Sequence, residues 1–128
     1  MPPLSTIIIY ARDMTAAARF YERFFGFETS GEVVEGLIEL APRAGGARIL
    51  IHQAAKGVRL GQVGVKLSFA VEDLASFKAT AEAKGLKFGA THQANGYSFA
   101  NAKDLDKNSI SISSRDFRQS AAASGSQL

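Results

Sequence analysis

The feature that most constrains the fold is an internal repeat, in which one order of elements occurs twice along the chain. A shift of 60 residues places Asp13 on Asp73, and after a one-residue gap a shift of 59 places Gly26 on Gly85. In both copies a predicted strand precedes an aspartate that can cap a helix, and a glycine and three short strands follow. This self-similarity predicts two βαβββ modules within one domain, an α+β fold.

The first copy begins with β-branched and aromatic residues over 6–12, which predict a strand. Asp13 can cap a helix predicted over 14–25, whose apolar residues recur at helical spacing. Gly26 is suited to end this helix. Breaks at glycine and proline divide the following residues into three predicted strands, over 27–34, 36–41 and 47–53.

A linker over 54–62 precedes the second copy. Residues 63–71 alternate between apolar and polar side chains, which predicts a strand, and Asp73 caps a helix that ends at Gly85. Three more strands are predicted over 86–92, 96–102 and 108–114. The domain therefore spans 1–114, with modules over about 5–53 and 63–114, and 115–128 is predicted to be a flexible tail.

Composition excludes several classes of function. The chain has 128 residues and no cysteine, which rules out disulfides, a thiolate nucleophile and Cys-based zinc sites. The net charge of +3 is mild and its basic residues are scattered, so nucleic-acid binding is not predicted. The early apolar run over 7–10 is too short for a signal peptide or a membrane span. We expect a cytoplasmic protein without nucleic-acid or membrane partners.

Three segments in order resemble the vicinal oxygen chelate superfamily, which includes glyoxalase I, extradiol dioxygenases and bleomycin resistance proteins. They are YARDMTAAARFYERFFGFE (10–28), FAVEDLASFKATAEAKG (69–85) and DLDKNSISI (104–112). The last resembles a family turn written Asp-Pro-Asp-Gly-Asn, with Leu105 and Lys107 replacing the proline and the glycine. The resemblance implies that each module curls its strands into a half-barrel, with its helix on the convex side and a ligand on the concave side.

In metal-using members of the family, the metal ligands lie on the first and last strands of each module. The resemblance places these positions at Thr6, Lys66, Ser111 and near His52. A catalytic metal site normally needs about three protein donors with free lone pairs, and a protonated lysine repels a cation. The resemblance therefore implies the metal-free, bleomycin-resistance-like branch, with no metal and no cofactor; no catalytic residue is predicted.

Strand parity and the family geometry together predict a ligand-binding pocket. Its predicted lining is Thr6, Ile8, Tyr10, Leu50, His52, Lys66, Ser68, Ser111 and Ser113. A lysine in this pocket favours a small organic ligand that is neutral or anionic. Solvent exposure of the lysine and of the histidine is the alternative interpretation of both.

Further roles stay open at this level. Tyr97 or Phe99 can supply a stacking wall or belong to the core, and Glu39 can act as a general base or face solvent.

The sequence predicts a metal-independent protein that sequesters a small organic compound, as bleomycin and antibiotic resistance proteins do. One alternative is a metal-dependent glyoxalase-type lyase or dioxygenase-type enzyme with an atypical site, and another is a module that binds a protein partner. We also expect a homodimer. The strand over 6–10 is apolar on both faces, and a half-barrel leaves strand edges open.

Overall fold

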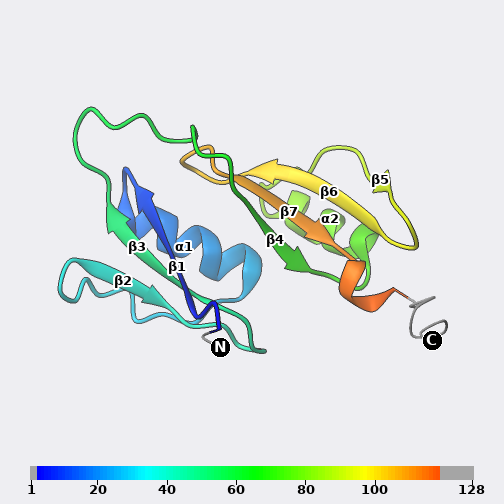
Figure 1. The fold of residues 1–128 in the computed structure, drawn as a ribbon, viewed down its shortest axis with the longest axis horizontal. Helices are drawn as coiled ribbons and strands as arrows, with labels where there is room; N and C mark the ends of the chain where they lie inside the picture. Colours follow the sequence, from blue (N-terminus) through cyan, green and yellow to red (C-terminus); the bar gives the residue numbers. More distant parts are fainter. Residues whose placement is uncertain (1–2, 119–128) are drawn as a thin grey trace. The chain divides into compact units, whose positions relative to one another are not determined.

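The computed structural model describes residues 3–118 and contains two main helices and two sheets (Figure 1). This confirms the predicted α+β class. The elements in chain order are β1 (Thr6–Ala11), α1 (Met14–Phe25), β2 (Leu37–Leu40), β3 (Arg48–Gln53), β4 (Lys66–Ala70), α2 (Leu74–Ala83), β5 (His92–Gln93), β6 (Ser98–Lys103), β7 (Ser109–Ser113) and a 3₁₀ helix, η1 (Arg115–Phe117).

The chain forms two compact units. Among the described residues, unit 1 comprises 3–64 together with Asp104–Asn108, the turn between β6 and β7. Unit 2 comprises Val65–Lys103 and the described residues 109–118. The chain therefore leaves unit 2 for one turn, which packs with unit 1, and then returns.

The sheet of unit 1 has the order β1-β3-β2, and α1 covers one of its faces (Figure 1). β1 runs parallel to β3, and β2 runs antiparallel to it. Because strand side chains alternate between the two faces, one face is buried against α1 and the other is open. The buried core consists of Ala17, Phe20, Tyr21, Ile38, Leu40, Ile49 and Ile51.

The sheet of unit 2 has the order β4-β7-β6-β5. β4 runs parallel to β7, and the other neighbours pair antiparallel. Its buried residues come from α2, from the segment after it and from the inward faces of β6 and β7; they include Leu74, Ala81, Leu86, Phe88, Ala100, Ile110 and Ile112. The opposite face of this sheet is partly open: Lys66 and Ser68 are exposed, whereas Ser111 at its centre is only 4% exposed.

Both predicted helix starts are confirmed. The Asp13 carboxylate accepts a hydrogen bond from the backbone N–H of Ala16 at 3.0 Å, and that of Asp73 accepts one from Ser76 at 3.1 Å. Each carboxylate satisfies a backbone donor that the first helical turn leaves free. Gly26 ends α1 with a left-handed φ of 72°, a conformation that favours glycine.

The strand predicted over 27–34 is wrong. This segment contributes only two isolated bridges, Glu28 to Ala41 and Val34 to Leu37. Side-chain hydrogen bonds explain the failure: the Thr29 hydroxyl accepts from the N–H of Gly31, and the Ser30 hydroxyl accepts from the N–H of Glu32. Such local bonds compete with a strand ladder.

Of the strand predicted over 86–92, only His92 lies in a strand, the two-residue β5 (His92–Gln93). The ammonium of Lys78 on α2 accounts for this, since it donates to the Gly89 carbonyl at 2.8 Å and to the Thr91 hydroxyl at 2.9 Å. These bonds tie the segment to its own helix, and the N–H of Gly89 donates to the Asn101 carbonyl of β6 at 2.8 Å without a continuous ladder forming. Leu86 and Phe88 are buried without being part of the sheet.

The predicted tail begins with an ordered turn, the 3₁₀ helix η1, while residues 119–128 lie outside the described part of the chain. Within residues 3–118, neither helix is long and apolar enough to cross a membrane.

Candidate ligand-binding faces

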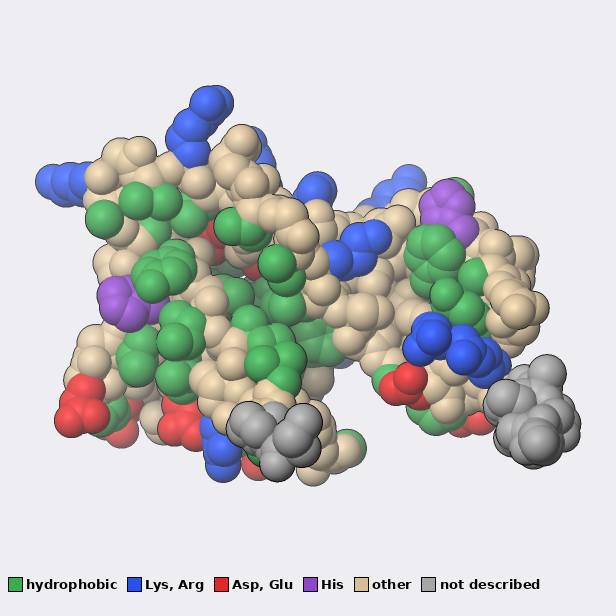
Figure 2. All heavy atoms as spheres, viewed as in Figure 1, with side chains coloured by type: hydrophobic (Ala, Val, Ile, Leu, Met, Phe, Trp, Pro, Cys, Tyr) green, Lys and Arg blue, Asp and Glu red, His purple; other side chains and the backbone are tan. Residues whose placement is uncertain are grey.

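The open face of unit 1 is apolar and aromatic at its centre. Ile8 and Tyr10 of β1 are each 51% exposed, and they pair with Leu50 and His52 of β3. The Tyr10 and His52 rings lie 5.0 Å apart between centroids, tilted by 50°. Figure 2 shows hydrophobic side chains gathered over this sheet. Such a group of exposed large apolar side chains is typical of a binding surface.

His52 presents a defined hydrogen-bonding edge on this face. Its Nδ1 lies 2.9 Å from the carbonyl oxygen of Gln53. A carbonyl can only accept, so Nδ1 carries the proton and, in the neutral ring, Nε2 is left as an acceptor. Glu39, which the sequence left open as a general base, lies on this face in an ion pair with Arg48 at 2.9 Å.

The linker after β3 closes one side of this face. A largely apolar groove of about 170 Å³ is lined by Val58 and Leu60 of the linker, by Val63 and by Ile8 and Tyr10 of β1. Sequence analysis missed Val58 and Leu60, because they follow no periodic pattern, and assigned Val63 to the strand predicted over 63–71, which begins only at Lys66.

Arg12 holds the linker in place. Its guanidinium donates to the carbonyl of Ala55 at 3.0 Å and to that of Val58. Gly61 lies so close to the turn between β6 and β7 that a Cβ there would come within 2.8 Å of the Lys107 Cβ.

The turn between β6 and β7 is fixed by the buried carboxylate of Asp104. It accepts from the backbone N–H groups of Asp106 and Asn108, from the Asn108 amide and from the Tyr21 hydroxyl, the last at 2.7 Å. Burial and the neighbouring Asp104 carboxylate raise the pKa of Tyr21 far above its ordinary value. Burial also raises the pKa of Asp106, although its hydrogen bond from the Arg12 N–H acts in the opposite direction. The turn resembling the family motif is thus a structural anchor of unit 1.

The open face of unit 2 is polar and is organised in rows across three strands. Lys66, Ser109 and Lys103 form one row, and Ser68, Ser111 and Asn101 form the next. The Lys66 ammonium donates to Asn101 Oδ1 at 2.9 Å, that of Lys103 donates to the Ser109 hydroxyl at 2.9 Å, and the Ser111 hydroxyl donates to that of Ser68 at 2.9 Å.

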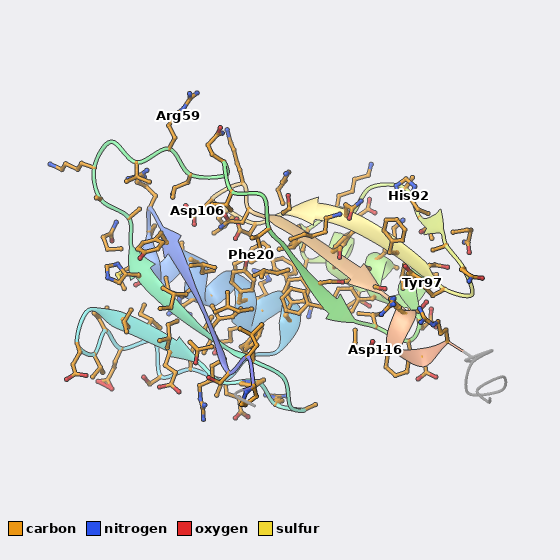
Figure 3. The ribbon with its side chains drawn as sticks, viewed as in Figure 1. Phe20, Arg59, His92, Tyr97, Asp106 and Asp116 are labelled. Carbon is orange, nitrogen blue, oxygen red and sulfur yellow. The ribbon has the colours of Figure 1, made fainter. Side chains whose placement is uncertain are left out.

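An aromatic group borders these rows. Phe99 pairs with Ser113 in a third row, and its ring lies 5.2 Å from that of His92. Tyr97 lies beside η1, with the guanidinium groups of Arg115 and Arg118 at 6.0 and 5.6 Å from its ring centroid (Figure 3). Phe99 therefore belongs to the open face, which the sequence could not decide.

The strand register corrects one equivalence between the two copies. Ser111 pairs with Ser68, and the residue 60 positions before Ser68 is Ile8, which pairs with Leu50. The counterpart of Ser111 in unit 1 is therefore Leu50 and not His52. The helix caps Asp13 and Asp73 are 60 residues apart, so β1 and β4 are related by a shift of 60. Their pairing partners Leu50 on β3 and Ser111 on β7 are related by a shift of 61.

The resemblance places the family's metal positions at Thr6, Lys66 and Ser111, and the strand pairing moves the fourth from His52 to Leu50. These four side chains offer neither an imidazole nor a carboxylate. Within residues 3–118, no group of three or more His, Cys, Asp or Glu side chains could hold a metal ion.

The predicted site residues thus occupy two open faces. Thr6, Ile8, Tyr10, Leu50 and His52 belong to the face of unit 1, and Lys66, Ser68, Ser111 and Ser113 belong to that of unit 2. That all nine line one pocket stays a prediction. Sequence analysis missed Asn101 and Lys103, because the register of their strand was not legible.

Known proteins resemble this chain in sequence and in fold. A family model described as the glyoxalase/bleomycin resistance protein/dioxygenase superfamily matches residues 4–112. No curated protein matches the sequence.

Among solved structures, a lactoylglutathione lyase from Agrobacterium tumefaciens is 25% identical, with a TM-score of 0.66 and coverage of 88% of this chain and 95% of that one. An antibiotic-binding protein from Streptomyces sp. CB03234 is 16% identical, with a TM-score of 0.73 and coverage of 88% and 94%. A bleomycin resistance determinant encoded on the transposon Tn5 is 21% identical, with a TM-score of 0.66 and coverage of 88% and 97%. The match over most of its length places this chain in the glyoxalase/bleomycin resistance protein/dioxygenase superfamily.

Proposed function

We propose that this protein binds a small organic compound, neutral or anionic, without a metal, and acts by sequestering it. The observation that carries the proposal is the residue set at the family's metal positions. Two hydroxyls, a leucine and a protonated lysine there fall short of the three imidazole, carboxylate or thiolate donors that hold a catalytic metal. Sequestration needs only shape, apolar contact and a few polar groups.

The open face of unit 1 supports this proposal. Tyr10 and His52 offer ring surfaces for stacking, and Ile8 and Leu50 flank them with apolar area. The adjoining groove beneath the linker extends this apolar surface. The resemblance to an antibiotic-binding protein and to a bleomycin resistance determinant agrees with such a role.

A thermal-shift screen of small aromatic compounds tests the proposal. A ligand at 100 times its dissociation constant stabilises a protein by about 2.7 kcal/mol, which raises the Tm of a domain this size by several degrees. We expect Tyr10→Ala to weaken binding of a hit. Phe117→Ala serves as the matched control, because Phe117 is an equally exposed aromatic residue at 51%, in η1.

Removing metal ions from the protein distinguishes this proposal from the alternative of a metal-dependent enzyme. We expect binding to be unchanged after dialysis against EDTA. Binding that EDTA abolishes and zinc, nickel, manganese or iron restores would contradict the proposal, as would EDTA-sensitive formation of lactoylglutathione.

The homodimer stays a prediction. The exposure of Ile8 and Tyr10 opposite the helix-covered face supports it, because a strand that is apolar on both faces is normally covered on both. One chain has a mass of 13.6 kDa, and light scattering at micromolar concentration should give twice this value. A value equal to one chain would refute it.

A further inference from the structure

We propose that the row Lys66–Ser109–Lys103 on the open face of unit 2 is an anion subsite that binds a carboxylate or sulfonate group of the ligand. The inference rests on the proposed function and narrows its ligand from neutral or anionic to anionic. It starts from the strand register, which places the two lysines on either side of the Ser109 of β7.

The geometry brings two cations to the same side of the sheet. β4 and β6 both neighbour β7, so the Cα atoms of Lys66 and Lys103 are separated by about 10 Å, twice the strand spacing. Two lysine side chains at that spacing can reach one small anion between them. Ser109 lies in the middle of the row and adds a hydroxyl that can donate.

Both lysines are held by neutral partners. Lys66 donates to the Asn101 amide oxygen and Lys103 donates to the Ser109 hydroxyl, each at 2.9 Å. Within residues 3–118, neither lysine forms an ion pair; the pairs present, Arg43 with Glu28 and Arg48 with Glu39, belong to unit 1. Each ammonium has three donors and uses one in these bonds, so donors remain for a ligand.

The neighbouring row extends the same chemistry. Ser68 and Ser111 share a hydrogen bond next to Asn101, which adds neutral polar groups beside the cations. Asp116 lines a cavity with Arg115, Ser113, Ala70 and Ser68. Two carboxylates, Asp104 and Asp106, follow Lys103 in the turn, and both already accept hydrogen bonds there. The row that holds two lysines is therefore the part of this face that favours an anion.

A matched pair of fluorescent probes tests the proposal. 1-Anilinonaphthalene-8-sulfonate carries a sulfonate, and N-phenyl-1-naphthylamine is the same ring system without it. We expect the sulfonate to bind more tightly, and Lys66→Met and Lys103→Met each to weaken it up to about fivefold, the upper range for one exposed charge pair. These variants should leave the neutral probe unaffected, and added salt should reduce the difference between the probes.

Lys87→Met is the control variant, since Lys87 is an exposed lysine of unit 2 outside the strand rows. Near-UV circular dichroism of each variant should match that of the parent protein, so that a loss of binding is not a loss of fold. If both probes bind equally well, and if neither Lys66→Met nor Lys103→Met changes their affinity, the anion subsite is overturned and the proposed function stands.

Benzoate, followed by amide chemical shifts, tests the subsite without the large ring system. Shifts at Lys66, Ser109 and Lys103 that are absent in the two methionine variants would support the subsite, even if neither naphthalene probe binds and the proposed function fails. Absence of such shifts together with absence of probe binding would overturn both proposals.

Discussion

Replacing Tyr21 with phenylalanine tests whether the turn between β6 and β7 stabilises unit 1. The Tyr21 side chain is fully buried, and its hydroxyl donates to Asp104 Oδ2 at 2.7 Å. The change Tyr21→Phe keeps the ring and its packing and removes only the hydroxyl. Asp104 keeps its other three donors, so no carboxylate oxygen is left without a partner.

The expected loss follows from the charge on the acceptor. A hydrogen bond to a charged group contributes about 1.5–3 kcal/mol, so we expect Tyr21→Phe to lower the free energy of unfolding by about 2 kcal/mol. With about 2.1 cal/mol/K of unfolding entropy per residue, the Tm should fall by about 7 °C. Urea unfolding and calorimetry measure both quantities.

Tyr10→Phe is the matched control, because Tyr10 is half exposed and its hydroxyl belongs to none of the hydrogen-bond networks described above. Its effect should stay within about 0.5 kcal/mol. Equal losses for the two variants would refute the role assigned to the Tyr21 hydroxyl.

The pH dependence gives an independent check. The pKa of Tyr21 is raised in the folded state above its ordinary 10.0, so the folded protein holds this proton more tightly than the unfolded chain. The associated stability is fully present below pH 10 and is lost as pH rises further, because only the unfolded state then releases the proton. The parent protein should therefore lose stability above pH 10 more steeply than Tyr21→Phe. A constant difference between the two would contradict the assignment.

Two further changes probe the same region. Gly61→Ala should destabilise the protein by at least about 1–2 kcal/mol, because Gly61 has a left-handed φ of 79° and a Cβ there would meet Lys107. Gly64→Ala is the control and should be near neutral, since a Cβ at Gly64 would have nothing within 4 Å. Similar midpoints of urea unfolding for the two variants would contradict this account. Burial raises the pKa of Asp106 above its ordinary 3.8, so the folded protein binds this proton more tightly than the unfolded chain does. The stability linked to the proton is therefore fully present below pH 3.8 and is lost as pH rises through the pKa of the folded state. The parent protein should therefore gain stability relative to Asp106→Asn as pH falls toward 4, and a difference that does not change with pH would count against it.

Local and periodic features of the fold were predictable from the sequence. The caps at Asp13 and Asp73 and the helix over 14–25 depend on residues within one or two turns of one another. The alternation of serine and isoleucine likewise predicted two unlike faces of β7. The strands predicted over 27–34 and 86–92 were wrong for most of their length. Side-chain hydrogen bonds, which leave no periodic trace, engage these segments, and only isolated backbone bonds join them to the strands.

The candidate site was predictable strand by strand but not across strands. Parity placed Tyr10 and Lys66 on open faces, since alternation is a property of one strand. Pairing is not local: the partner of Lys66 lies on β7, and those of Ser111 lie on β4 and β6. The sequence suggested a shift of 59 for the last strands, and the pairing gives 61, so the counterpart of Ser111 moves by two residues, from His52 to Leu50. Register is fixed by the burial of whole faces, which only the folded sheet shows.

The corrected register also shows that the two copies place different side chains on matching backbone positions. Ile8 and Leu50 in unit 1 occupy the positions of Ser68 and Ser111 in unit 2, so one backbone pairing carries an apolar contact in one copy and a hydroxyl pair in the other. A site built around a metal gives every position the same task, which is to supply a lone pair. Positions whose side chains differ this much do not share that task. Unit 1 presents ring and apolar surface there, whereas unit 2 presents hydroxyl, amide and ammonium groups. Such different side chains on matching backbone positions agree with the proposed binding of an organic compound through apolar contact and a few polar groups, without a metal.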